Sequence, residues 1–102
     1  MNQHYAQQAK MTAQPGKRDE LIEHLSASIE ILKQTPGCIY YLISTTKEPD
    51  VIWVWELWES KTAKDALAAN PESARVMQEI MPLIASVDNR TELTVVSGFG
   101  LE

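Results

Sequence analysis

Glu56 is the residue whose surroundings most suggest chemistry, because it interrupts the otherwise apolar run Val54-Trp55-Glu56-Leu57-Trp58. A carboxylate among apolar neighbours must be paired, hydrogen-bonded or neutral. Such a group can serve as a general acid or base. A structural ion pair with Lys10 or Arg90, or a place at the rim of a dimer, also accounts for it and is the more usual role of such a residue. The sequence leaves the catalytic and the structural interpretation open.

Aromatic residues accompany this carboxylate on two neighbouring segments: Tyr40, Tyr41, Trp53, Trp55 and Trp58. Two-residue alternation along a strand places Trp53 and Trp55 on one face, and Trp58 on the other face with Glu56. Aromatic clusters usually form a core or an interface, but a flat apolar substrate could bind on either face. We expect Trp58 to line a pocket, with Tyr40 or His4 as a hydrogen-bond donor to a substrate oxygen.

Other nucleophiles and metal ligands are few. One cysteine and two histidines are too few for a zinc site of the Cys/His type, and the four glycines form no phosphate loop. We therefore predict no metal site. His24 is expected to face solvent on a helix, and Cys38 to be a small core residue at the start of a strand.

The composition predicts one domain over residues 1–102, with 44% apolar residues and a net charge of −5. A nucleic-acid partner is not expected, because binding to phosphates requires a basic surface. No membrane partner is expected either, since the longest apolar run, Val51 to Trp55, is far too short to span a bilayer. A single cysteine favours a reducing, cytoplasmic location.

Periodicity and turn residues predict an α+β, ferredoxin-like order of β-α-β-β-α-β around a four-stranded antiparallel sheet. Pro15-Gly16 and Pro36-Gly37 bound the first helix, and Asn70-Pro71 divides the second helical region. The expected strands are 4–14, 38–46, 51–59 and 90–99, and the expected helices are 17–35, 60–69 and 72–86, the last with a kink at Pro82.

The hairpin over residues 38–59 is apolar on both faces, whereas an antiparallel hairpin usually exposes one polar face. The chain's own helices can cover one of these faces. A second copy of the chain is the economical cover for the other. The sequence therefore predicts a homodimer with two sheets packed face to face.

These features resemble the antibiotic biosynthesis monooxygenase family. The resemblance rests on the element order, on Pro36-Gly37-Cys38, on Trp55-Glu56-Leu57-Trp58-Glu59-Ser60, on Asn70-Pro71 and on Met81-Pro82-Leu83-Ile84. It implies a dimeric α+β barrel and, in many members, direct reaction of an electron-rich aromatic substrate with dioxygen, without metal or flavin. Glu56 and Trp58 match the family motif residue by residue. Leu67 and Glu72 occupy two positions at which members commonly carry histidine.

The resemblance implies a cofactor-independent monooxygenase of a small aromatic, quinol or polyketide-like substrate. Glu56 would orient a polar group or accept a proton, and Trp58 would hold the ring. Two alternatives use the same pocket. One is a non-catalytic dimeric domain that binds a small ligand or is associated with stress, and the other is an isomerase of a small oxygenated metabolite.

Overall fold

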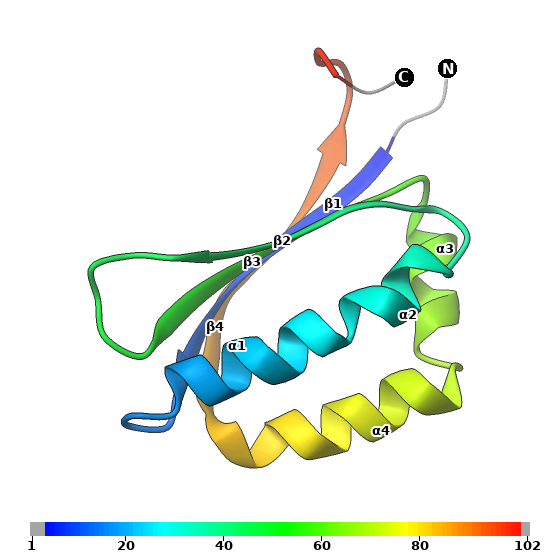
Figure 1. Ribbon diagram of the computed structural model, residues 1–102. Coiled ribbons are helices and arrows are strands. Elements are labelled where there is room, and N and C mark those ends of the chain that lie inside the picture. Colours follow the sequence, from blue (N-terminus) through cyan, green and yellow to red (C-terminus); the bar gives the residue numbers. More distant parts are fainter. Residues whose placement is uncertain (1–3, 101–102) are drawn as a thin grey trace.

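The computed structural model describes residues 4–100, which form a four-stranded antiparallel sheet with helices on one face (Figure 1). The strands run in the order β2-β3-β1-β4, which confirms the predicted ferredoxin-like topology. The elements follow one another as β1 His4–Ala13, α1 Arg18–Ala27, α2 Ile29–Lys33, β2 Cys38–Thr45, β3 Val51–Trp58, α3 Lys61–Leu67, α4 Pro71–Ile80, the short 3₁₀ helix η1 Met81–Leu83 and β4 Ile84–Val95. Within residues 4–100, no helix is long and apolar enough to cross a membrane.

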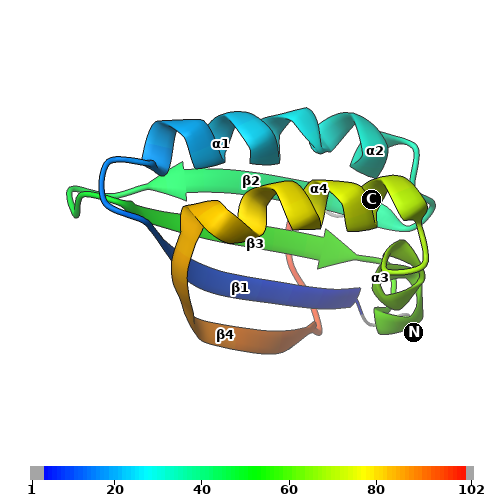
Figure 2. The ribbon, with the colours of Figure 1, turned by 90° about the horizontal axis from the view of Figure 1, so that it is seen from below.

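The hydrophobic core lies between the sheet and the helices α1, α2 and α4, which run along the same face (Figure 2). Side chains from the inner face of β1 and β3 meet side chains from α1, α4 and η1. The buried members of this cluster are Ala13, Leu21, Leu25, Ile52, Val54, Ile80 and Leu83. The apolar stripe predicted for the first helix therefore does face the sheet.

The first helical region differs from the single helix predicted over residues 17–35, because it is interrupted at Ser28. The Ser28 hydroxyl donates to the backbone oxygen of Leu25 at 2.6 Å, and the Ser28 amide is shared between the oxygens of His24 and Leu25. A serine hydroxyl that bonds back to the preceding turn competes with the regular ladder and bends a helix. The buried stripe continues across the break through Leu32.

The end of the second helical region also corrects the prediction. Helix α4 ends at Ile80 rather than near residue 86, and β4 begins at Ile84 rather than at residue 90. Pro82 explains the early end, because proline has no amide hydrogen and its ring clashes with the preceding turn. The chain then pairs at once with the end of β1, where the Gln14 amide donates to the oxygen of Leu83 at 2.8 Å.

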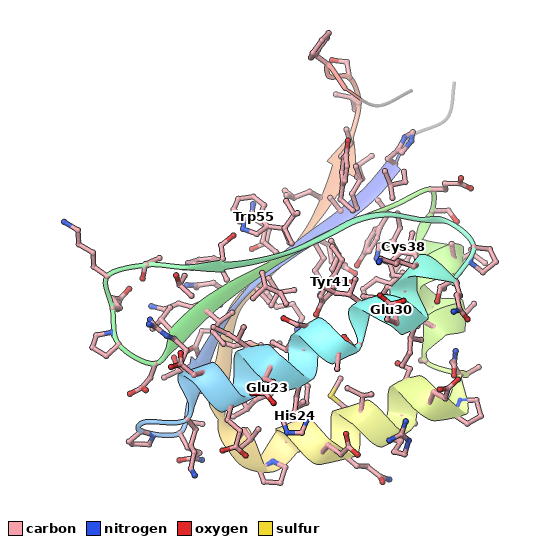
Figure 3. The ribbon with its side chains drawn as sticks, in the orientation of Figure 1. Glu23, His24, Glu30, Cys38, Tyr41 and Trp55 are labelled. Carbon is pink, nitrogen blue, oxygen red and sulfur yellow. The ribbon has the colours of Figure 1, made fainter. Side chains whose placement is uncertain are left out.

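The outer face of the sheet carries no helix (Figure 1) and exposes several large apolar side chains. Trp55 lies on this face, on the opposite side of the sheet from Tyr41 (Figure 3). Strand pairing places Leu42 directly opposite Trp55, and Leu93 opposite Ala6. The structure thus confirms that the hairpin has two apolar faces, of which the chain itself covers one.

Candidate functional site

Four polar side chains, one from each strand, form a row across the inner face of the sheet. Tyr41 on β2 is opposite Glu56 on β3, Glu56 is opposite Gln7 on β1, and Gln7 is opposite Glu92 on β4. Directly opposite residues of antiparallel strands point to the same face, with Cβ atoms about 5 Å apart. We call these four residues the polar row. It runs from under the helices to the exposed edge strand β4.

A cavity of about 170 Å³ lies between the polar row and the helices. Its apolar wall comes mainly from α1, α2 and α4, through Leu25, Ile31, Leu32, Val76, Met77 and Ile80. Its polar lining comes from the sheet and from α3, through Gln7, Tyr41, Glu56, Lys64 and Arg90, with Ser28 and Ser73 on the helices. A mostly apolar cavity with a few convergent polar groups is the usual form of a small-molecule site.

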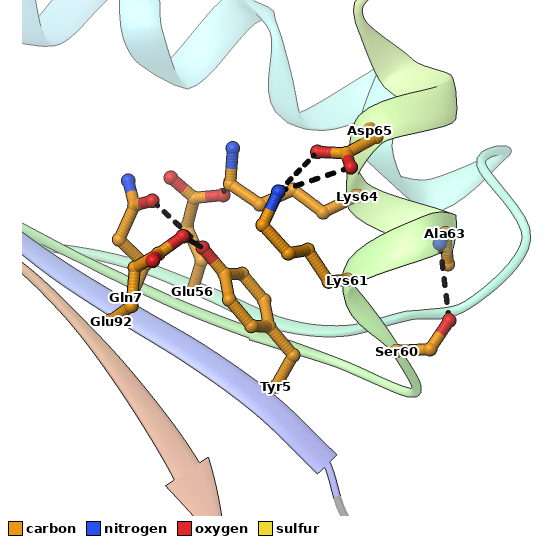
Figure 4. Close-up of polar contacts among 9 residues, drawn as sticks. All are labelled: Tyr5, Gln7, Glu56, Ser60, Lys61, Ala63, Lys64, Asp65 and Glu92. Carbon is orange, nitrogen blue, oxygen red and sulfur yellow. Dashed lines mark hydrogen bonds and ion pairs between the residues drawn. The ribbon is translucent and has the colours of Figure 1, made fainter.

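Glu56 is held by two neighbours. The indole Nε1 of Trp58 donates to Glu56 Oε1 at 3.1 Å. The Lys64 ammonium lies 3.9 Å from the same oxygen, and Figure 4 shows these two residues. The Glu56 side chain is 15% exposed, and Trp58 is fully buried. The sequence predicts that Trp58 lines the pocket, but its indole contacts the carboxylate from behind, and Trp58 is not among the residues that line the cavity.

The cation paired with Glu56 is not one that the sequence suggested. Lys10 lies 3.7 Å from Glu48 instead, and Arg90 lines the cavity from β4. Lys64 reaches Glu56 because α3 begins immediately after β3, where the Ser60 hydroxyl caps the helix by accepting from the Ala63 amide at 3.1 Å (Figure 4). The sequence predicts Ser60 as the cap of this helix. Lys64 follows Ser60 by four residues, about one helical turn, and this spacing was the signal that could have identified it.

Tyr41 presents a hydroxyl from β2 toward the helices (Figure 3). Burial raises the pKa of Tyr41 well above its usual range, and the neighbouring Glu56 and Cys38 raise it further. The phenol therefore stays protonated at neutral pH and can donate a hydrogen bond. Among the residues that the structure describes, none forms a hydrogen bond with this hydroxyl, so it is available to a ligand in the cavity.

Tyr5 supports the other end of the polar row. Its hydroxyl donates to Glu92 Oε2 at 2.7 Å and lies 3.1 Å from Gln7 Oε1 (Figure 4). Burial first, and then the hydrogen bond and charge of Glu92, raise the pKa of Tyr5 to about 12. The sequence did not single out Tyr5 or Gln7 as site residues, because their contacts depend on residues far away in the chain.

The structure does not bring Tyr40 and His4 to this cavity. Tyr40 lies on the outer face, 46% exposed, and its hydroxyl donates to the backbone oxygen of Gly100 at 3.2 Å. His4 is half-buried opposite Val95, and alternation also places it on the outer face. In each case the neighbouring tyrosine, Tyr41 or Tyr5, faces inward instead. Of the predicted site residues, the structure therefore brings together Glu56 and Trp58.

Cys38 shares the inner face with Trp58, because a register shift between Cys38 and Tyr40 breaks the simple alternation of β2. Burial, and then Glu56, raise the pKa of the Cys38 thiol, so it remains protonated and is a poor nucleophile. His24 is partly exposed on α1, with Nδ1 3.9 Å from Glu79 Oε1 on α4. Within the described part of the chain, no three His, Cys, Asp or Glu side chains are grouped so that they could hold a metal ion.

Comparison with known proteins gives consistent matches. The family model for antibiotic biosynthesis monooxygenase matches residues 4–79. The chain is 35% identical to a candidate antibiotic biosynthesis monooxygenase from Chloroflexus aurantiacus J-10-fl, with a TM-score of 0.86, over 97% of this chain and 99% of that one. No curated protein matches the sequence.

Two more distant structures show likeness of fold. PA3566 from Pseudomonas aeruginosa is 19% identical, with a TM-score of 0.82, over 95% of this chain and 98% of that one. A mutant of SnoaB, a cofactor-independent oxygenase from Streptomyces nogalater, is 11% identical, with a TM-score of 0.82, over 96% and 98%.

Proposed function

Because the chain belongs to the antibiotic biosynthesis monooxygenase family, we propose that it is a cofactor-independent monooxygenase of a phenol or quinol with a single ring. The observation that carries the proposal is the placement of Glu56 and Tyr41 side by side in the polar row, both facing one cavity. The likeness of fold to SnoaB, a cofactor-independent oxygenase, supports this reaction class.

The size of the cavity selects the substrate. An apolar cavity of about 150 Å³ in another protein is large enough to hold benzene. The present cavity, at about 170 Å³, therefore suits one aromatic ring with small substituents. Its apolar wall would contact the ring face, and the polar row would contact the ring oxygens.

In the proposed reaction, Glu56 accepts the proton of the substrate hydroxyl and Tyr41 donates a hydrogen bond to the resulting phenolate oxygen. The phenolate then reduces dioxygen, and a bond forms between a ring carbon and oxygen. Glu56 returns its proton to give a hydroperoxide. Loss of the ring C–H proton then accompanies cleavage of the O–O bond, which releases water and leaves a quinone. One phenol and one dioxygen thus give one quinone and one water, and Lys64 and Arg90 offset the negative charge that develops.

The test is oxygen uptake by the wild-type protein and by Glu56→Gln over a panel of phenols and hydroquinones with one ring. A glutamine can still accept the Trp58 hydrogen bond but cannot take the substrate proton, so kcat/KM should fall about 10²- to 10⁴-fold. Glu59→Gln removes the same charge from an exposed position three residues away and should leave the rate unchanged. Wild-type uptake no faster than background, or equal rates for the two variants, would contradict the proposal.

A homodimer is part of the proposal. Its support is the uncovered outer face, on which Tyr40, Leu42, Trp55 and Leu93 are all exposed. Contiguous exposed apolar surface on a small protein marks an interaction site. A second copy would present the same surface, so the two faces would be self-complementary across a twofold axis.

A second candidate is binding without catalysis, which the cavity lining favours at one point. Leu67 lines the cavity at a position where family members commonly carry histidine, so one common proton carrier is missing. A protein of this kind would bind single-ring ligands with equal affinity before and after Glu56→Gln, and would show no turnover. Conversion of a ligand in the absence of oxygen would instead indicate an isomerase.

A further inference from the structure

Gln7 lies at the centre of the polar row, and its side chain connects the cavity to the edge of the sheet. Gln7 is 7% exposed. Among residues 4–100, it is the one polar residue that is buried. One end of its amide contacts the Tyr5 hydroxyl, at 3.1 Å from Oε1, while the residue also lines the cavity. A buried amide with an oxygen at one end and an NH₂ group at the other must present one of the two to the cavity.

The Tyr5 hydroxyl can satisfy either end of this amide, because a phenol both donates and accepts hydrogen bonds. In one arrangement Tyr5 donates to Gln7 Oε1, and Gln7 Nε2 faces the cavity as a donor. In the other arrangement, the Tyr5 hydroxyl donates to Glu92 over the shorter distance of 2.7 Å. The Tyr5 oxygen then accepts from Gln7 Nε2, so Gln7 Oε1 faces the cavity as an acceptor.

Glu92 allows both arrangements without leaving a polar group unsatisfied. It is exposed on the edge strand β4, so water can hydrogen-bond to its carboxylate whenever Tyr5 turns its proton toward Gln7. Turning the amide by 180° exchanges its two ends with little change in shape. The network therefore supports two hydrogen-bonding states of nearly equal packing.

We propose that Gln7 is the specificity-determining residue of the cavity and that it binds a ligand oxygen in both its hydroxyl and its carbonyl form. In the resting complex, before the proton passes to Glu56, Gln7 Oε1 accepts from the O–H group of the reduced ligand. After oxidation, Gln7 Nε2 donates to the C=O group of the oxidised ligand. This inference rests on the proposed function for the ligand class, since oxidation of a phenol to a quinone turns a hydroxyl into a carbonyl.

The test uses two single-ring probes under anaerobic conditions: phenol, which can donate, and acetophenone, which can only accept. NMR of the side-chain amide of Gln7 should show contacts from the Nε2 protons to acetophenone in its complex, and to the Tyr5 ring in the phenol complex. Gln7→Met, which removes both ends of the amide, should weaken binding of both probes about tenfold relative to toluene. The matched control Gln78→Met changes an exposed residue of α4 and should bind all three as the wild type does.

The same Nε2 contacts in both complexes, or no binding of either probe to the wild type, would overturn the inference. A Gln7→Met variant that binds both probes as tightly as the wild type would also overturn the inference. Neither measurement uses turnover, so a protein without oxygenase activity can still show the two amide orientations. Oxygen uptake with one fixed amide orientation would leave the monooxygenase proposal standing and refute the role of Gln7.

Discussion

Leu42→Asp should dissociate the proposed homodimer, because this side chain lies on the uncovered face of the sheet, on the edge strand β2. Leu42 is 54% exposed and stands directly opposite Trp55 across β2 and β3. In the proposed dimer, both side chains would be buried against the second sheet. An aspartate at this position would remove apolar contact and force a carboxylate into the interface.

The size of the effect follows from the exposed fraction of Leu42. Full burial of a leucine side chain is worth about 1.5–3 kcal/mol, so the half still exposed here is worth about 1 kcal/mol. A symmetric dimer contains the substitution twice, which doubles this loss to about 2 kcal/mol. Two desolvated carboxylates add about 2 kcal/mol each, for a total of about 6 kcal/mol. The dissociation constant should therefore rise by about four orders of magnitude.

Sedimentation velocity over micromolar concentrations measures this directly. The wild type should sediment with twice the chain mass of 11.5 kDa, and Leu42→Asp with the mass of one chain. Met81→Asp is the matched control, because Met81 is 59% exposed but lies in η1, away from the outer face. A monomeric wild type would refute the dimer, and dissociation by Met81→Asp but not by Leu42→Asp would refute the chosen surface.

Three further predictions test the fold and the site. Gly37→Ala should lower the free energy of unfolding in urea by about 2–4 kcal/mol, because φ is +91° and a Cβ would lie 2.6 Å from an α3 side chain. The control Gly16→Ala has φ of +77° but open space around it, so it should cost about 1 kcal/mol. Trp58→Phe removes the donor to Glu56 and should lower the unfolding free energy by about 2–3 kcal/mol; an unchanged urea midpoint would show that this bond contributes nothing. The pKa of Tyr5 is about 12 in the folded protein against 10 for an ordinary tyrosine, so wild-type stability should fall as the pH rises from about 10 to 12. Tyr5→Phe should lose less stability than the wild type between about pH 9 and 11. An equal loss in both proteins would contradict this linkage.

Local features of the sequence were sufficient for much of the architecture. Two-residue alternation in β3 correctly placed Glu56 and Trp58 on one face and Trp55 on the other. Ser60 begins α3 as its cap, and Asn70 begins α4 by accepting from the Glu72 amide at 2.8 Å. These features involve residues within a few positions of one another, so propensity and capping chemistry decide them without tertiary context.

The sequence was less reliable where local preference competed with packing. The apolar pattern after Met77 continues through residue 87 and therefore suggested a long helix. The same residues also suit a strand, and Pro82 ends the helix before β4 pairs with β1. The interruption at Ser28 is similar, because a side chain that bonds to the backbone ended the helix while the buried stripe continued beyond it.

The sequence by itself determined that this protein has a ferredoxin-like order of elements, a sheet with two apolar faces and a carboxylate among aromatic residues. Only the tertiary structure decided which side chains meet that carboxylate. The polar row joins positions 7, 41, 56 and 92, which alternation within one strand cannot relate to one another. Register between strands sets these contacts, and a shift of one residue exchanges the faces. For that reason Tyr41 rather than Tyr40 faces the cavity. Lys64 rather than Lys10 pairs with Glu56 because α3 folds back over the end of β3, a contact between helix and sheet that strand alternation does not reveal.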